Sequence, residues 1–309
     1  ILMIFSSLSL WLREAGVDRS SVTFFSWAAL GYSFKFVWAP LVDKLPVPFL
    51  TVRMGRRRAW MLVSQCAVIT AILWMAFTNP AEGSSQLVVM ALGAVLLGFS
   101  SATQDIVIDA YRIESAEPEL QALLASTYIA GYRIAMIVSG AGALYLASAF
   151  GSSRGAYLYS AWQWTYVAMA GVMLVGVVTT LIIEERPYSG AVSYSYPTRD
   201  YLGFLALFLI SAGGFIAVFL LTGGAAAQLK EGLRSATENR HLAGFVVEAA
   251  RLGTGILSAV LIGRLTMMTG LFNRAMVREG YVEPVRDFFG RYGAGVALLL
   301  ERTPRPLSW

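Results

Sequence analysis

Long apolar stretches separated by short polar connections are the feature that most limits how this chain can fold. Several windows hold roughly 18 or more predominantly apolar residues with few charges, which is the length that a helix needs to cross a bilayer. Hydrophobic residues make up 57% of the sequence and charged residues 14%, whereas soluble domains are about a quarter charged. We therefore predict an all-α polytopic membrane protein, because a helix satisfies its backbone hydrogen bonds within one lipid-embedded segment.

The apolar stretches predict eight helices and the start of a ninth near residue 292. The eight are residues 1–14, 22–43, 59–78, 86–112, 122–149, 158–183, 200–221 and 242–263. Residues 1–185 hold six closely spaced spans. A polar linker and two looser spans follow in residues 186–282, and residues 283–309 begin a further part. Six spans followed by a linker are typical of one half of a secondary transporter built from two repeats.

We expect the sequence to be a piece of a longer chain. It opens inside an apolar stretch, ILMIFSSLSLWL, without a start methionine or a charged lead, which is not typical of a signal peptide. The ninth span stops after GAGVALLL, because the prolines and arginines of ERTPRPLSW cannot continue a membrane helix. The first and ninth spans are therefore expected to be truncated.

Basic residues are distributed unevenly between alternate connections, and this predicts the orientation. One set of connections carries Lys44, Arg53, Arg56, Arg57, Arg58, Arg112, Arg186, Arg199, Arg264, Arg274, Arg278, Arg286 and Arg291. The other set carries Arg13, Arg19, Arg154, Lys230, Arg234 and Arg240. Basic residues in short loops favour the cytoplasmic side, so the N-terminus is expected in the cytoplasm.

Few residues are suited to catalysis or metal binding. The single cysteine, Cys66, excludes an internal disulfide framework, and the single histidine, His241, leaves little for a histidine-rich metal site. We expect no enzymatic activity, no cofactor and no metal. The net charge of +5 favours basic loops at an anionic membrane face, and no nucleic-acid partner is expected.

The connection after the second predicted span, APLVDKLPVPFLTVRMGRRRAW, resembles the cytoplasmic loop signature of the major facilitator superfamily. Asp43 and Lys44 take the acid–basic places, and an insertion, LPVPFLTVR, separates them from the terminal cluster. That cluster is Gly55, Arg56, Arg57 and Arg58. An ordinary positive-inside loop would explain the arginines by itself. The acid favours a structural gate, because a carboxylate is unusual beside an anionic membrane face.

Two basic residues lie unusually deep in predicted spans. Arg133 is about 16 Å into the fifth span at 1.5 Å per residue, so it should face a cavity or a carboxylate, and we expect it to bind an anionic group of a substrate. Lys35 lies about 12 Å from the cytoplasmic end of the second span. It is a second candidate for substrate binding, and the alternative is that its side chain snorkels to water.

The fourth span ends in SATQDIVIDAYRIE, with Asp105 and Asp109 on one helix face and Arg112 on the same stripe. Asp109 is within a turn of the helix end, where Arg112 can pair with it and anchor that end. Asp105 is a turn deeper, at the depth of Lys35, and the two are expected to pair. A carboxylate whose charge depends on a nearby cation and on water access suits proton coupling, and we assign that role to Asp105.

Four segments in order resemble the muropeptide permease (AmpG) family of the major facilitator superfamily. They are YSFKFVWAPLVDKLPVPFL with GRRRAW, then SATQDIVIDAYRIE, GYRIAMIVSGAGAL and VEPVRDFFGRYG. The resemblance covers nearly the whole chain and implies a six-helix N-terminal bundle plus two inserted spans. It also implies a permease of the bacterial inner membrane that imports anhydro-muropeptides, driven by protons.

Two other functions remain open from the sequence. One is an acetyl-CoA carrier of the related branch, in which Arg133 would face phosphates. The other is a helix bundle that is a structural remnant of a permease and transports nothing.

Overall fold

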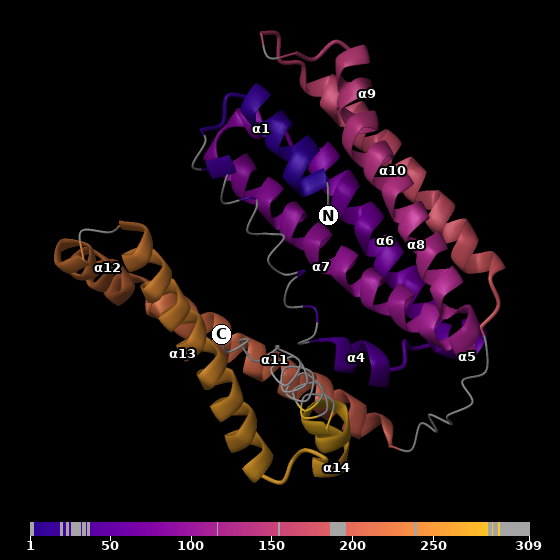
Figure 1. Cartoon of the computed structure of the whole chain (residues 1–309), viewed down its shortest axis with the longest axis vertical. Coiled ribbons are helices and arrows are strands. Elements are labelled where there is room, and N and C mark those ends of the chain that lie inside the picture. The colour runs from indigo at the N-terminus through magenta and orange to yellow at the C-terminus, as the bar shows by residue number, and fades with distance from the viewer. Residues whose placement is uncertain are drawn as a thin grey trace, which may run out of the picture. The chain divides into compact units, whose positions relative to one another are not determined.

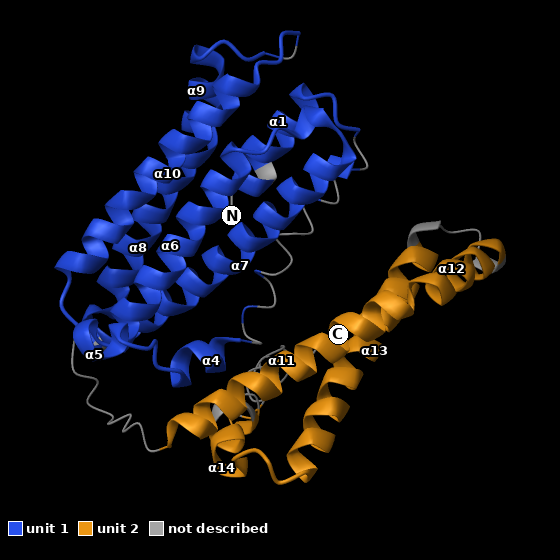
Figure 2. Ribbon diagram, turned by 180° about the vertical axis from the view of Figure 1, so that it is seen from behind, with its two compact units in different colours: residues 1–191 blue, residues 192–309 orange. Residues whose placement is uncertain are grey.

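The computed structural model describes residues 3–18, 21, 22, 25, 32, 35, 38–115, 117–153, 155–185, 196–237, 240–283, 286 and 290. The chain divides into two compact units, residues 1–191 and 192–309 (Figure 2). Every regular element among the described residues is a helix, apart from one isolated bridge between Ser153 and Ala156. The all-α prediction is therefore confirmed for this part of the chain, whereas the expected boundaries at 185 and 282 stay predictions.

In the described part of the chain, 6 helices are long and apolar enough to cross a membrane. They are α6 (Arg56–Ala76), α7 (Ser84–Glu114), the continuous run of α8 (Gln121–Ile137), η6 (Val138–Gly142) and α9 (Ala143–Ala149), α10 (Tyr159–Ile182), α11 (Thr198–Leu221) and α13 (Arg240–Met268). Each coincides within a few residues with a predicted span, except that α13 runs past residue 263 to Met268.

The remaining predicted spans are described only in part. The first is a π-helical turn, η1 (Ile4–Leu8), that continues into α1 (Ser9–Glu14). The second contributes α4 (Ala39–Lys44). Most of residues 22–37, the linker at 186–195 and the ninth span from residue 292 lie outside the described residues. Short helices α5 (Leu50–Met54), η4 (Pro80–Glu82) and η5 (Pro118–Leu120) lie in connections.

Helix α6 is the centre of the first unit and packs against both α7 and α10 (Figure 1). Half of the 18-residue apolar segment of α6 is buried, whereas only 11% of the corresponding segment of residues 121–149 is buried. A Cβ at Gly93 of α7 would lie 2.8 Å from Met75 Cγ, so this glycine allows α6 and α7 to approach closely. At one end of the bundle, Trp11 stacks on Trp162 with ring centroids 5.7 Å apart and meets Tyr166 edge-on at 4.7 Å.

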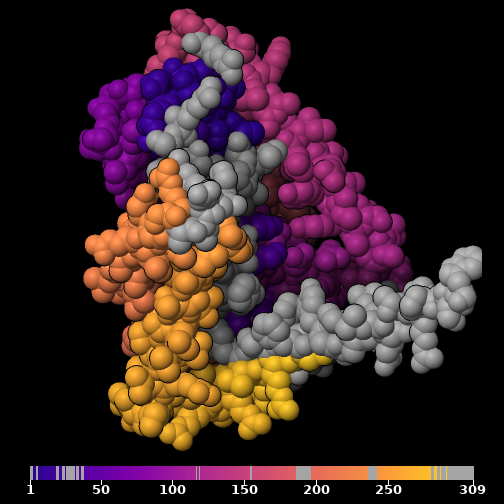
Figure 3. Space-filling view, turned by 60° about the vertical axis from the view of Figure 1, so that its left-hand side comes forward, coloured from indigo at the N-terminus to yellow at the C-terminus, as the bar shows by residue number. Residues whose placement is uncertain are grey.

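The region from α8 to α10, magenta to rose in Figure 3, carries many exposed apolar side chains. They include Leu123, Ile129, Ile134, Ile137, Tyr145, Val175 and Ile182. A soluble monomer rarely exposes so large an apolar area. Exposed apolar helix faces are expected where helices meet lipid tails.

The second unit contains a helix that the sequence did not predict. The stretch between the predicted spans 200–221 and 242–263 opens with Gly223–Gly224, a pair that usually marks a turn, but it forms α12 (Gly223–Thr237), which packs on α13. The glycines lie at its first two positions, and three alanines with strong helix propensity follow. Ala226 is buried and Leu233 half-buried, which gives α12 an apolar stripe. The unit ends in α14 (Arg274–Val277) and η7 (Arg278–Val282).

Candidate functional site

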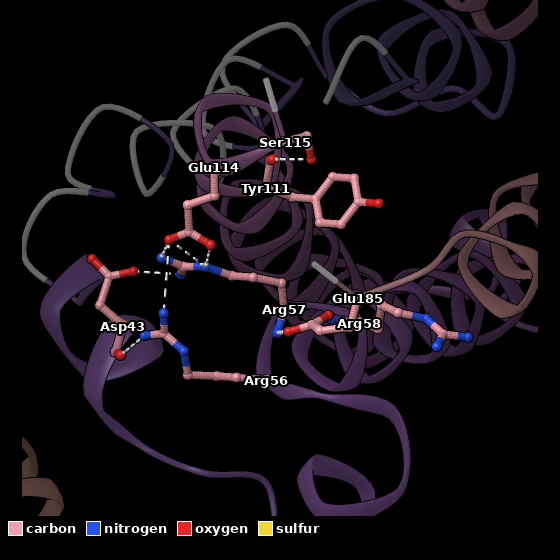
Figure 4. Close-up of polar contacts among 8 residues, drawn as sticks. All are labelled: Asp43, Arg56, Arg57, Arg58, Tyr111, Glu114, Ser115 and Glu185. Atoms are coloured by element: carbon pink, nitrogen blue, oxygen red, sulfur yellow. Dashed lines mark hydrogen bonds and ion pairs between the residues drawn. The ribbon is translucent and has the colours of Figure 1, made fainter. Parts of the chain in front are cut away.

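Two polar clusters in the first unit contain most of the predicted site residues. The first cluster lies where α4 and α7 end and α6 begins (Figure 4). Arg57 Nη1 lies 2.6 Å from Asp43 Oδ1, and Arg57 Nε lies 3.0 Å from Glu114 Oε2. The Arg57 side chain is only 8% exposed, so two carboxylates compensate a buried guanidinium. We call this set, with Arg56, the loop cluster.

Arg56 adds a second bridge inside the loop cluster. Its guanidinium donates to the backbone carbonyl of Asp43, and its Nη2 lies 3.7 Å from Glu114 Oε1. Glu114 therefore pairs with two arginines at once. The loop cluster ties the ends of three helices together, and the structural-gate role that the loop sequence suggested stays a prediction.

Glu185, just beyond α10, caps the start of α6 (Figure 4). Its carboxylate oxygens accept hydrogen bonds from the backbone N–H groups of Arg57 at 2.8 Å and Arg58 at 3.0 Å. A carboxylate is favourable there because the first N–H groups of a helix lack intrahelical partners and carry partial positive charge.

Arg58 makes the converse contact with the end of α10. Its Nε donates to the carbonyl of Thr180 at 3.0 Å, and its Nη2 donates to that of Leu181 at 2.8 Å. Each helix thus supplies the group that caps the end of the other. We refer to these four hydrogen bonds as the reciprocal cap.

Gly55 precedes α6 with φ +87° and ψ 168°, a region of backbone space that is nearly restricted to glycine. The predicted positions Asp43 and Arg56 to Arg58 all lie in the loop cluster or the reciprocal cap, and Gly55 directly precedes them. Lys44 ends α4 beside them. The inserted segment LPVPFLTVR does not separate the halves of the signature, because it folds into α5 and returns the chain to Asp43.

The second cluster joins Lys35, from the second predicted span, to α7. Lys35 Nζ contacts Asp105 Oδ2, as the sequence predicted, and it also lies 3.6 Å from Asp109 Oδ2. Arg112 Nη2 lies 3.7 Å from Asp109 Oδ1. The expected pairing of Asp109 with Arg112 is therefore present, and Lys35 additionally bridges the two aspartates. The four residues form what we call the intramembrane cluster.

Two tyrosines complete the surroundings of the intramembrane cluster. The Tyr128 hydroxyl, on α8, donates to Asp105 Oδ1 at 2.9 Å, and the Arg112 guanidinium lies 5.5 Å from the centre of its ring. Lys35 Nζ lies 5.1 Å from the ring of Tyr32. The Asp105 side chain is 14% exposed and that of Asp109 is 36% exposed, so the deeper carboxylate is the more shielded.

Arg133 stands apart from both clusters. It is exposed on α8, and its nearest polar contact within the described residues is Met136 Sδ, 4.0 Å from Nη1. The carboxylate partner that the sequence offered as one possibility is not found among the described residues. The other possibility, that Arg133 faces a cavity, stays a prediction.

Sequence reasoning missed Glu114, Glu185 and Tyr128. Each acid lies at or just beyond the end of a predicted span, on the side that the basic loop was expected to occupy, and that position was the available signal. No comparable signal marks Tyr128, because tyrosines are frequent in this sequence and its partner is on another helix.

Packed apolar helices with ionised groups held inside the bundle define a polytopic membrane protein of the transporter class. The model of the Major Facilitator Superfamily matches residues 1–277, and the chain belongs to that family. It is thus a multi-pass member of a transporter superfamily.

Curated relatives carry related names. The chain is 37% identical over 186 residues to "Putative transporter AmpG 4" of Rickettsia felis, which covers 60% of this chain and 42% of that protein. It is 34% identical over 203 residues to "Anhydromuropeptide permease" of Escherichia coli K12, covering 64% of this chain and 38% of that protein. An uncharacterized protein of Haemophilus influenzae is 29% identical over 296 residues, covering 90% and 64%. The chain spans less than half the length of the two named relatives.

Proposed function

We propose that this chain forms the N-terminal half of a proton-coupled transporter that imports anhydro-muropeptides across the bacterial inner membrane. The substrate class rests on the similarity to a relative named anhydromuropeptide permease. The coupling rests on one observation: a shielded carboxylate, Asp105, in contact with Lys35 inside a membrane-spanning helix. Ionisable groups in such positions are expensive and are retained chiefly for function.

The charges of the intramembrane cluster suggest how proton and substrate are linked. Two cations, Lys35 and Arg112, balance two carboxylates, Asp105 and Asp109, when all four are ionised. A proton on Asp105 leaves the cluster with a net charge of +1 and leaves Lys35 with Asp109 as its partner. A carboxylate of the substrate can then neutralise the excess charge. Proton and anion thereby stabilise each other's binding, as symport requires.

Arg133 is our candidate for a second contact with the substrate. Its guanidinium is exposed and makes no ion pair with the described residues, so it is free to bind a carboxylate through two parallel hydrogen bonds. The loop cluster is assigned to gating at the cytoplasmic end. This assignment places the N-terminus in the cytoplasm, in agreement with the distribution of basic residues.

The test is uptake of labelled anhydro-muropeptide into vesicles that contain the complete transporter. An inward proton gradient should drive accumulation, and Asp105→Asn should abolish accumulation while exchange of labelled for unlabelled substrate continues. The matched control is Glu119→Gln, which removes an exposed carboxylate from η5, outside both clusters, and should retain accumulation. Normal accumulation by Asp105→Asn with an unchanged pH dependence would exclude Asp105 as the coupling group.

A further inference from the structure

Tyr128 is the point at which α8 contacts the intramembrane cluster. Among the described residues, it is the one side chain in the interior of α8 that hydrogen-bonds another helix, through Asp105 Oδ1 at 2.9 Å. The apolar window of the 121–149 run is only 11% buried, and no residue of α8 belongs to the buried core. The position of α8 therefore depends on few contacts, and the Tyr128–Asp105 bond is prominent among them.

The strength of this hydrogen bond depends on the charge of Asp105. A phenol that donates to a carboxylate makes a charge-assisted bond, roughly twice as strong as a bond between neutral groups. A proton on Asp105 converts it to a neutral acid and takes up part of its acceptor capacity. Protonation thus weakens the tie between α7 and α8 at Tyr128.

The other charged and titratable groups around Asp105 are Lys35 and Tyr32 from the second predicted span, Asp109 and Arg112 from α7, and Tyr132 from α8, which interacts electrostatically with Tyr32. Tyr32 also hydrogen-bonds Asp105 and loses that charged acceptor on protonation, but its ring stays beside Lys35. Lys35 retains Asp109, and Arg112 retains both Asp109 and the face of the Tyr128 ring. Tyr128 loses its charged acceptor and has no second one among the described residues.

We propose that Tyr128 is a positioning residue that transmits the charge state of Asp105 to α8, and through α8 to Arg133. Arg133 follows Tyr128 by five residues, about 7.5 Å along the helix axis at 1.5 Å per residue. A shift of α8 on release of Tyr128 moves Arg133 with it. This inference rests on the proposed function, because it requires Asp105 to exchange a proton.

Spin labels on the 309-residue chain in lipid nanodiscs test this relation. Cys66 is replaced by Ala, and labels are attached at Val63 of α6 and Ile134 of α8, which are 37% and 63% exposed. The distance between the labels should change with pH in this parent protein. Asp105→Asn should give, at every pH, the distance between the labels that the parent protein shows at low pH. Tyr128→Phe, which removes only the hydroxyl, should abolish the pH-dependent shift.

The control is Tyr132→Phe, which removes a hydroxyl one turn further along α8 and should keep the parent shift. Infrared titration of the carboxylic acid band, assigned by its loss in Asp105→Asn, reports proton binding separately and should persist in Tyr128→Phe. If Tyr128→Phe keeps the pH-dependent change in distance while its Asp105 band still titrates, the role of Tyr128 is overturned and the proposed function is not. Absence of a titrating Asp105 band in the parent would overturn the proposed function as well.

Discussion

Glu185 occupies the space that a side chain at Gly55 would need, since a Cβ built on Gly55 overlaps the Glu185 side chain. The same glutamate caps α6 through the N–H groups of Arg57 and Arg58. The requirement for glycine at this point of the loop thus has two causes: its positive φ and the close approach of the carboxylate that caps the following helix.

Gly55→Ala should therefore destabilise the first unit. The backbone conformation alone should cost about 1–3 kcal/mol, and the overlap with Glu185 adds to it. Thermal unfolding of the purified chain in detergent measures the effect. Gly131→Ala is the matched control, because a Cβ there meets nothing within 4 Å and should leave the transition almost unchanged. Equal transitions for the two variants would contradict the close approach of Glu185.

Arg57→Ala should be among the most damaging single changes in the loop cluster. It leaves Asp43 and Glu114 without the guanidinium that they share. Breaking a fully buried ion pair costs about 3–5 kcal/mol, and the loss should be smaller here because Asp43 is 46% exposed and Glu114 keeps Arg56. Arg57→Lys should recover only part of the loss, because lysine lacks the planar fork that reaches both acids. Folded yield and unfolding temperature measure the effect. Arg53→Ala, on the exposed face of α5, should match the parent.

Arg133→Ala should lower the affinity for the anionic substrate without lowering folded yield. The side chain is exposed and supports no other described helix, so its removal leaves packing intact. Equilibrium binding of labelled anhydro-muropeptide to the complete transporter tests this. Arg264→Ala removes an exposed arginine from α13 and serves as the control. Unchanged binding by Arg133→Ala at normal yield would remove Arg133 from the substrate site.

The orientation predicted from basic residues can be tested with single cysteines in a Cys66→Ala protein. Arg53 and Ser84 are both exposed. Arg53 lies just before α6, and Ser84 begins α7, so the two positions lie near opposite ends of α6. An impermeant thiol reagent added to intact spheroplasts should label Ser84→Cys and spare Arg53→Cys. The reverse pattern would invert the topology. Arg53 is preferred to Arg57 because the side chain of Arg57 is buried.

The spans were predictable because hydropathy depends on composition over many residues, and α6, α7 and α10 all follow it closely. The Lys35–Asp105 contact was also predictable, since two opposite charges at one depth in neighbouring helices have few other ways to be tolerated. Both predictions use only the position of each residue along the chain and the free-energy cost of placing its side chain in lipid.

The rest depended on which helix faces meet. Tyr128 and Asp105 are 23 residues apart on different helices, and nothing in either segment specifies their relative rotation. Glu185 is 128 residues from Arg57, and its role emerges only when α6 and α10 lie side by side. Helix α12 was missed because Gly223–Gly224 usually marks a turn, whereas packing on α13 supports a helix that starts at these glycines.

The reciprocal cap has a mechanical consequence for any transport cycle. Bonds run in both directions between the start of α6 and the end of α10, so a displacement of one helix along its axis against the other would stretch all four together. A slip of one turn, about 5.4 Å, would break every one of them. Helices α6 and α10 are therefore expected to move together at this end, whereas α8, which makes fewer contacts, is expected to shift more easily.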